Sequence, residues 1–188
     1  MDIQTALGRL DPWLDELDAI VRRGFAIYRD YPAAVLVEHD SRAAAACVFC
    51  HMLREAERRF SEDRRRGVGM LAVRGLNLIR FEDFALVRFK KMDEDGNTRN
   101  YPTEQAISFD AQEPLPDLPL AAVRLSVGYV PDATATAIEQ VVLAKPNGRF
   151  AEWAAAINPA AAPRWTDITR QATLGEDFRR PERRGTGP

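Results

Sequence analysis

The sequence lacks the features that take a chain to or across a membrane. Its first residues, MDIQTALGRLDPWLDEL, contain no basic segment followed by an apolar one, and no apolar run approaches the roughly 20 residues that span a bilayer. Only two cysteines occur, which excludes a disulfide-rich class. Neither sign of charge dominates, because 26 basic residues accompany 28 acidic ones. We therefore expect a cytoplasmic protein with no membrane partner and no overall attraction to nucleic acid.

Motifs of the common enzyme classes are missing as well. The chain contains no GxxxxGKS or GxxxxGKT phosphate loop, no GxSxG serine elbow, no HExxH and no Glu-x-Lys. Residues 67–72 fit GxGxxA, but they lead from a predicted helix into a predicted strand, the reverse of the order that binds a pyrophosphate. We predict no catalytic residue and no cofactor. A non-enzymatic protein is favoured, and an unfamiliar enzyme or metalloprotein around His51 is an alternative.

The composition is that of a single globular domain. Of the 188 residues, 46% are apolar and 29% are charged, which excludes disordered and collagen-like classes. A chain of this length buries one good core and is short for two. We predict one α+β domain over residues 1–178 and a flexible basic tail over residues 179–188.

The first third of the chain has helical periodicity. Asp11-Pro12 is a good helix start, and apolar residues then recur at three- and four-residue spacing as far as Tyr28, which predicts a helix over residues 11–29. Tyr31-Pro32 ends it, and residues 33–37 are expected to be extended. His39-Asp40-Ser41 opens a second helix that is predicted to reach Asp63.

From Gly67 onward the apolar residues alternate with a period of two. Residues 70–81, 84–91 and 123–129 are predicted strands, and Thr103 caps a short predicted helix over residues 104–111. Asn147-Gly148 lies between two more apolar runs and predicts a hairpin with these two residues as its loop. In that register Val142 lies opposite Trp153, on the same face of the sheet.

Helices first and strands later, without regular alternation, indicate an α+β fold. We predict two N-terminal helices packed on one face of a largely antiparallel sheet of five or six strands. A β-sandwich flanked by helices is the alternative.

The sharpest local motif is Cys47-Val48-Phe49-Cys50-His51, which matches the pattern of c-type haem attachment. Covalent haem requires export, however, and the motif lies inside a predicted amphipathic helix, so we favour buried or half-buried thiols. Zinc bound by Cys47, Cys50, His51 and His39 is the metal alternative. His51 could also act as a general base oriented by Glu55, although a surface histidine is the simpler interpretation.

Basic residues form several groups along the chain. If these groups converged on one face, they could neutralise phosphates and bind nucleic acid. The alternative is that they are solvated helix ends and strand edges. The residues of the candidate nucleic-acid site are Arg58, Arg59, Arg64, Arg65, Arg66, Arg88 and Lys90.

Three segments carry a resemblance to other proteins: EHDSRAAAAC, ALVRFKKMDEDGNTRNYPTEQA and LSVGYVPDATATAIEQVVLAKPNG. In their order, between Tyr31 and Trp153, the chain resembles a set of uncharacterised bacterial proteins, some encoded near mobile elements or helix-turn-helix regulators. The resemblance implies a role in a toxin-antitoxin, phage or defence system and brings no catalytic residue. We therefore expect a protein that binds another protein or itself as a homodimer, with nucleic-acid binding as the alternative.

Overall fold

The computed structural model describes residues 1–61, 67–98 and 103–170. The predicted tail over residues 179–188, Arg64 to Arg66, and the predicted helix end at Asp63 lie outside these ranges. In chain order the elements are α1 (Ile3–Leu10), the 3₁₀ turn η1 (Asp11–Trp13), α2 (Leu14–Arg29), α3 (Ala33–Leu36), α4 (Ser41–Ser61), β1 (Val68–Val73), β2 (Leu76–Phe81), β3 (Ala85–Lys91), α5 (Glu104–Asp110), β4 (Val123–Pro131), β5 (Ile138–Asn147), β6 (Phe150–Ile157) and β7 (Trp165–Asp167).

The described strands form one seven-stranded sheet whose order follows the chain from β1 to β7. All neighbouring strands are antiparallel except β3 and β4, which run parallel and are joined by a crossover that contains α5. The predicted α+β fold with a largely antiparallel sheet is confirmed, with seven strands instead of five or six. One additional strand arises because residues 70–81 are not a single strand.

A two-residue turn at Arg74-Gly75 divides the predicted strand into β1 and β2. Both residues have positive φ angles, 49° and 79°, as a type I′ hairpin turn requires. Glycine adopts this conformation readily, but arginine does not, and Val73 and Leu76 continue the apolar run on either side. The prediction missed the turn because only one of its two residues is typical of it.

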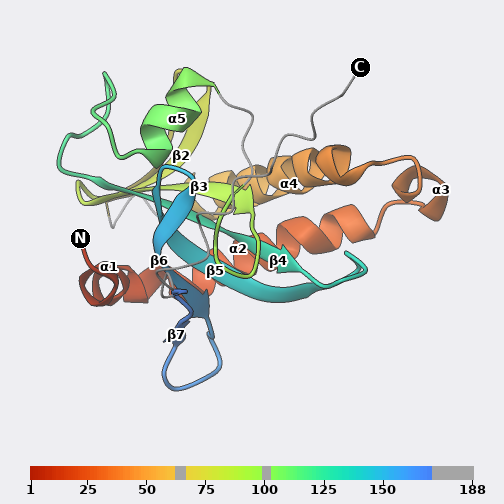
Figure 1. Ribbon diagram of the computed structural model, residues 1–188. Coiled ribbons are helices and arrows are strands. Elements are labelled where there is room, and N and C mark those ends of the chain that lie inside the picture. Colours follow the sequence, from red (N-terminus) through yellow and green to blue (C-terminus); the bar gives the residue numbers. More distant parts are fainter. Residues whose placement is uncertain (62–66, 99–102, 171–188) are drawn as a thin grey trace, which may run out of the picture.

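The helices α2 and α4 lie side by side and cover one face of the sheet, whereas α5 lies apart from them (Figure 1). The main core cluster joins residues of both helices, such as Val21 and Met52, to alternate strand residues such as Phe89 and Leu125. At the helix crossing, Gly24 permits close approach, because a Cβ there would lie 2.5 Å from Met52 Cγ. This confirms that N-terminal helices pack on the sheet.

Two details of the helical region differ from the prediction. The chain is already helical over α1, where Asp2 caps the helix by accepting a hydrogen bond from the Thr5 N–H at 2.9 Å. Asp11-Pro12 therefore lies in η1 and does not begin the first helix. Residues 33–36 form the short helix α3 and are not extended; alanine and leucine favour this conformation once Pro32 has started it.

The predicted register of the β5–β6 hairpin is wrong. Asn147 pairs with Phe150, so the loop residues are Gly148 and Arg149, and an irregularity beside Pro146 moves the register by a further residue. Trp153 consequently lies opposite Lys145 and is buried in the main core beneath the helices, whereas Val142 lies on the other face. Proline has no N–H for the strand ladder and is tolerated inside a sheet at such irregularities.

The second face of the sheet has its own, smaller cores. Leu78 and Leu86 pack beneath Phe109 of α5 and residues of the linker that follows it. Farther along, the turn over residues 93–97 lies on β5 and β6, where a Cβ on Gly96 would come within 2.8 Å of the Ala154 Cβ. Both faces of the central strands are therefore covered.

Candidate functional site

The strand β1 forms one outer edge of the sheet, because no other described strand pairs with it beyond β2. Val73 and Leu76 flank the two-residue turn and therefore form a hydrogen-bonded pair. Hydrogen-bonded and non-hydrogen-bonded pairs alternate along an antiparallel ladder. Accordingly, Gly67 accepts a hydrogen bond from the Glu82 N–H at 2.7 Å. The intervening residues Val68, Met70 and Ala72 then direct their N–H and C=O groups away from β2.

The side chains of β1 make this edge apolar. Its sequence, VGMLAV, contains no charged residue and no proline. Met70, Leu71 and Val73 are half-buried and Ala72 is exposed, while a Cβ on Gly69 would meet no other atom within 4 Å. Charged side chains and prolines are the usual means by which proteins prevent an edge strand from pairing. β1 has neither.

The opposite edge of the sheet is better protected. There β7 has three residues, ends in Asp167 and is preceded by Pro163. A short strand with a charge and a nearby proline offers few groups for pairing. The contrast between the two edges makes β1 the candidate interaction site.

A flank of α4 accompanies β1. Helix α4 contacts α2 on one side and β1 and β3 below. Successive residues of the helix are rotated by about 100°. Val48 and Met52 therefore lie on the flank that faces α2, and Ala46 and Leu53 lie on the opposite flank, which is on the β1 side. Ala46 is exposed and Leu53 is half-buried. The same flank also carries Cys50 and Glu57, and Glu57 is paired with Arg54 at 3.2 Å. The apolar edge therefore continues onto the helix only at Ala46 and Leu53, beside a paired charge.

A buried ion pair lies on the second face, beneath α5. Arg88 of β3 and Asp110 of α5 are 4% and 6% exposed, and the Arg88 Nη2 binds the Asp110 carboxylate. Arg88 Nε donates to Ser126 Oγ at 3.1 Å, and the guanidinium lies 4.5 Å from the Phe109 ring centroid. Burial lowers the pKa of Arg88, and the charge of Asp110 opposes this change. The pair fastens α5 to the sheet.

Most of this cluster was not predicted from the sequence. Arg88 and Lys90 were expected as nucleic-acid contacts, and no role was predicted for Asp110, Ser126 or Arg124, all of which are buried. Burial and the nearby positive charge of Arg88 lower the pKa of Lys90 to about 8. The available signal was the short helix predicted between the strands over residues 84–91 and 123–129, because such a helix can cover the sheet face on which strand alternation places Arg88 and Lys90.

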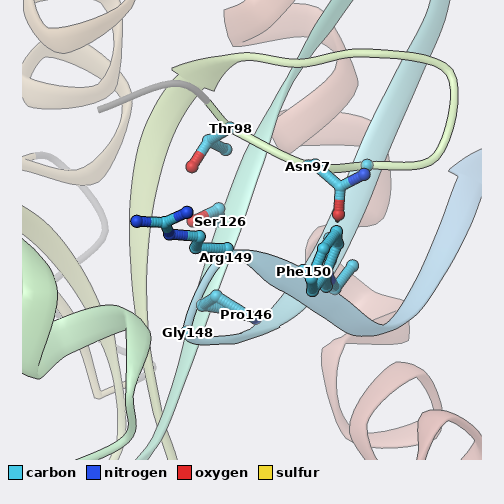
Figure 2. A pocket seen from close by; sticks show the side chains of 10 residues that line it. Asn97, Thr98, Ser126, Pro146, Gly148, Arg149 and Phe150 are labelled. Carbon is cyan, nitrogen blue, oxygen red and sulfur yellow. The ribbon is translucent and has the colours of Figure 1, made fainter. Parts of the chain in front are cut away.

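Beside this cluster lies a shallow hollow between the 93–98 turn and the β5–β6 turn (Figure 2). Figure 2 shows Arg149 folding back from its turn toward Ser126, while the Asn97 side chain lies near Phe150. The Asn97 Oδ1 accepts a hydrogen bond from the Ala151 N–H at 2.8 Å and holds the turn in place. The free volume, about 10 Å³, is at the lower limit for one water molecule. The hollow does not accommodate a small-molecule substrate in this structure.

A larger cleft, of about 460 Å³, lies between the start of α4 and the end of β3. Lys91 Nζ crosses it to donate to Ser41 Oγ at 3.0 Å. Asp40 already accepts hydrogen bonds from the backbone N–H groups of Arg42 and Ala43, at 2.9 and 2.7 Å. The positive end of α4 is therefore satisfied by a carboxylate of its own chain.

The described residues of the predicted nucleic-acid site do not share one surface. Arg58 and Arg59 lie on α4, over the first face of the sheet, and both bind Glu55, at 2.7 and 2.6 Å. Hydrogen bonds from these arginines lower the pKa of Glu55 to about 2. Arg88, in contrast, is buried beneath α5 on the second face. Its guanidinium is not available to a phosphate in this conformation.

The two histidines among the predicted metal ligands have other partners. Tyr28 and His39 share a hydrogen bond of 3.3 Å, and Tyr31 and His51 share one of 2.8 Å. Cys47 is half-buried and Cys50 is exposed, and both are free thiols. Within the described ranges, no three histidine, cysteine, aspartate or glutamate side chains form a group that could hold a metal ion. The carboxylate of Glu55, expected to orient His51, is occupied by the two arginines.

Comparisons with known protein families, with curated proteins and with solved structures find no match. None of the helices in the described part of the chain is long and apolar enough to cross a membrane.

Proposed function

We propose that this protein is a non-enzymatic component that binds a protein strand, either from itself or from a partner, at the β1 edge of its sheet. The observation that carries the proposal is an outer strand of six residues with no charge and no proline. An unprotected edge of this kind is a template for pairing with another chain.

The physical basis is strand addition. An incoming extended segment would receive hydrogen bonds from the outward N–H groups of Val68, Met70 and Ala72 and donate to their C=O groups. Its side chains would alternate between the two faces of the sheet and contact Met70 on one face and Leu71 on the other. Backbone bonds supply affinity in such complexes, and side-chain contacts supply specificity.

The biological setting within this proposal comes from the resemblance to bacterial proteins encoded near mobile elements. It favours a component of a toxin-antitoxin, phage or defence system, where assembly with a second chain is a common requirement. The proposed partner is accordingly a strand of a second protein from the same locus or a second copy of this chain.

A lysine at the edge tests the proposal. Ala72→Lys places a charge at an exposed position of β1, where it should block pairing without disturbing the core. Ala160→Lys makes the same change at an exposed position of the β6–β7 connection and is the matched control. We expect the wild-type chain and the control to assemble with themselves or with a co-expressed neighbouring gene product in size-exclusion chromatography with light scattering, and Ala72→Lys not to.

The outcomes separate clearly if circular dichroism shows equal folding of the three proteins. Loss of assembly in the Ala72→Lys protein alone supports the β1 edge. Assembly that survives Ala72→Lys, or that Ala160→Lys abolishes equally, contradicts the proposal. A wild-type chain that remains a monomer and captures no neighbouring gene product also contradicts it.

A further inference from the structure

We infer that the strand added to β1 is β1 of a second copy, paired antiparallel so that Met70 of one chain lies opposite Met70 of the other. The inference rests on the proposed function and specifies its partner. The two sheets would then join into one continuous sheet, and a two-fold axis perpendicular to it would pass between the two Met70 residues.

The outward backbone groups of β1 are arranged symmetrically about Met70. Val68, Met70 and Ala72 are equally spaced, so a rotation about Met70 exchanges Val68 with Ala72 and leaves every outward N–H opposite an outward C=O. A strand with this spacing is complementary to its own rotated copy. A pairing centred on Leu71 would leave the outward groups of Val68 opposite the turn that begins at Arg74.

The side chains of β1 also fit this register. In the register centred on Met70, Gly69 of one chain lies opposite Leu71 of the other. The space beside Gly69 is open, because no atom lies within 4 Å of a Cβ built there, and the Leu71 side chain of the second copy can occupy it. On the other face, the two half-buried Met70 side chains meet, and methionine adapts readily to such contacts.

The charge distribution of β1 is also compatible with a two-fold axis. A two-fold axis places a strand against its own sequence, so a charged residue near the axis would face the same charge. β1 contains no charged residue and therefore avoids this repulsion. The net charge of −2 on each chain also opposes association only weakly.

Helix α4 supplies additional contact area. Because the axis is perpendicular to the sheet, the α4 helices of both copies lie on the same face and approach each other across the axis. The flank that carries Ala46 and Leu53 is the one that faces the axis, and the small side chain of Ala46 favours close approach. Glu57 lies on the same flank, where its ion pair with Arg54 offsets its charge. A stable interface buries at least about 1,200 Å² in total, and we expect the helix flanks to contribute alongside the strand pair.

Cysteine cross-linking tests the register. In a background in which Cys47 and Cys50 are replaced by alanine, Met70→Cys places two thiols on residues whose Cα atoms would be about 5.5 Å apart, within the range of a disulfide. Ala72→Cys is the control, because the two copies of that residue would be four positions apart, about 13 Å along the strand. Each protein is oxidised with copper phenanthroline and compared on a non-reducing gel and by light scattering before oxidation.

We expect a mass of twice 21.1 kDa before oxidation and at least tenfold more cross-linked dimer for Met70→Cys than for Ala72→Cys. Equal or greater cross-linking at position 72 would overturn the register. A monomer that is not cross-linked at either position but binds a neighbouring gene product in an Ala72→Lys-sensitive way would overturn the second copy while leaving the proposed function intact. Assembly insensitive to Ala72→Lys would overturn both.

Discussion

Replacing Asp110 by alanine should destabilise the protein strongly, because it leaves the positive charge of Arg88 buried without its carboxylate. Both residues are more than nine-tenths buried, and the Arg88 guanidinium contacts the Phe109 ring and Ser126 of β4. Water cannot replace the lost carboxylate without opening the contact between α5 and the sheet. The effect should therefore be that of a broken buried ion pair.

The expected magnitude follows from this burial. Removing one partner of a buried ion pair costs about 3–5 kcal/mol of unfolding free energy. Since the whole stability of a domain is about 5–15 kcal/mol, the variant should remain folded at room temperature only if the parent is of average stability or better. In a domain of this size the loss corresponds to a decrease in melting temperature of about 6–20 °C.

Urea denaturation followed by circular dichroism measures the change. Glu57→Ala is the matched control, because it breaks the exposed Arg54–Glu57 pair of 3.2 Å on α4 and should cost at most about 1 kcal/mol. In the double variant Arg88→Met with Asp110→Leu, no buried charge remains from the pair, so most of the lost stability should return. A cost below about 1 kcal/mol for Asp110→Ala would refute the claim that this pair is buried and fastens α5.

Three further predictions concern protonation and packing. Burial lowers the pKa of Lys90 to about 8, so between pH 8 and 10 the unfolded chain binds more protons than the folded chain. The unfolding free energy should therefore rise with pH in this window, and Lys90→Met should abolish the rise. The pKa of Glu55, lowered to about 2 by two arginines, means that its contribution is present above pH 4.5 and is lost as the pH falls toward 2, a loss that Glu55→Gln should remove. Gly24→Ala should cost about 1–3 kcal/mol in urea denaturation, because its Cβ would lie 2.8 Å from the Met52 N. Gly8→Ala, at a helical position with no atom within 4 Å, should be neutral or stabilising.

Each of these predictions has a contradicting result. A parallel rise in stability for wild type and Lys90→Met would show that another group titrates between pH 8 and 10. An unchanged acid profile in Glu55→Gln would show that the arginine contacts on α4 contribute nothing. Equal effects of alanine at positions 24 and 8 would show that α2 and α4 do not approach as closely as described.

The sequence predicted the class of fold because its strongest signals are local and repeated. The apolar residues recur about every 3.6 positions before Gly67 and every two positions after it. Both periods appear in the structure, as helices before Gly67 and mainly as strands after it. The crossover helix was predictable from Thr103, whose side chain accepts a hydrogen bond from the Ala106 N–H. These features depend on neighbouring residues only.

Register and edges could not be predicted in the same way. The irregularity at Pro146 depends on how β5 fits between β4 and β6, and it moves Trp153 to the opposite face from Val142. The turn at Arg74 depends on a positive φ that the local sequence does not favour. The candidate site is an edge, and whether a strand lies at an edge follows from the order of the whole sheet.

The parallel pairing of β3 with β4 separates the antiparallel hairpins of the chain into two groups. Every antiparallel ladder lies entirely before Met92 or entirely after Ala122, so a protease cut within the crossover would leave two pieces that each retain their own hairpins. The parallel ladder, the packing of the helices and contacts between the two pieces, such as the ion pair of Arg164 with Asp11, would then hold the pieces together. At this ladder a Cβ on Gly128 would overlap the Lys90 carbonyl oxygen, 1.7 Å away, and the two halves can rejoin in register only with glycine there.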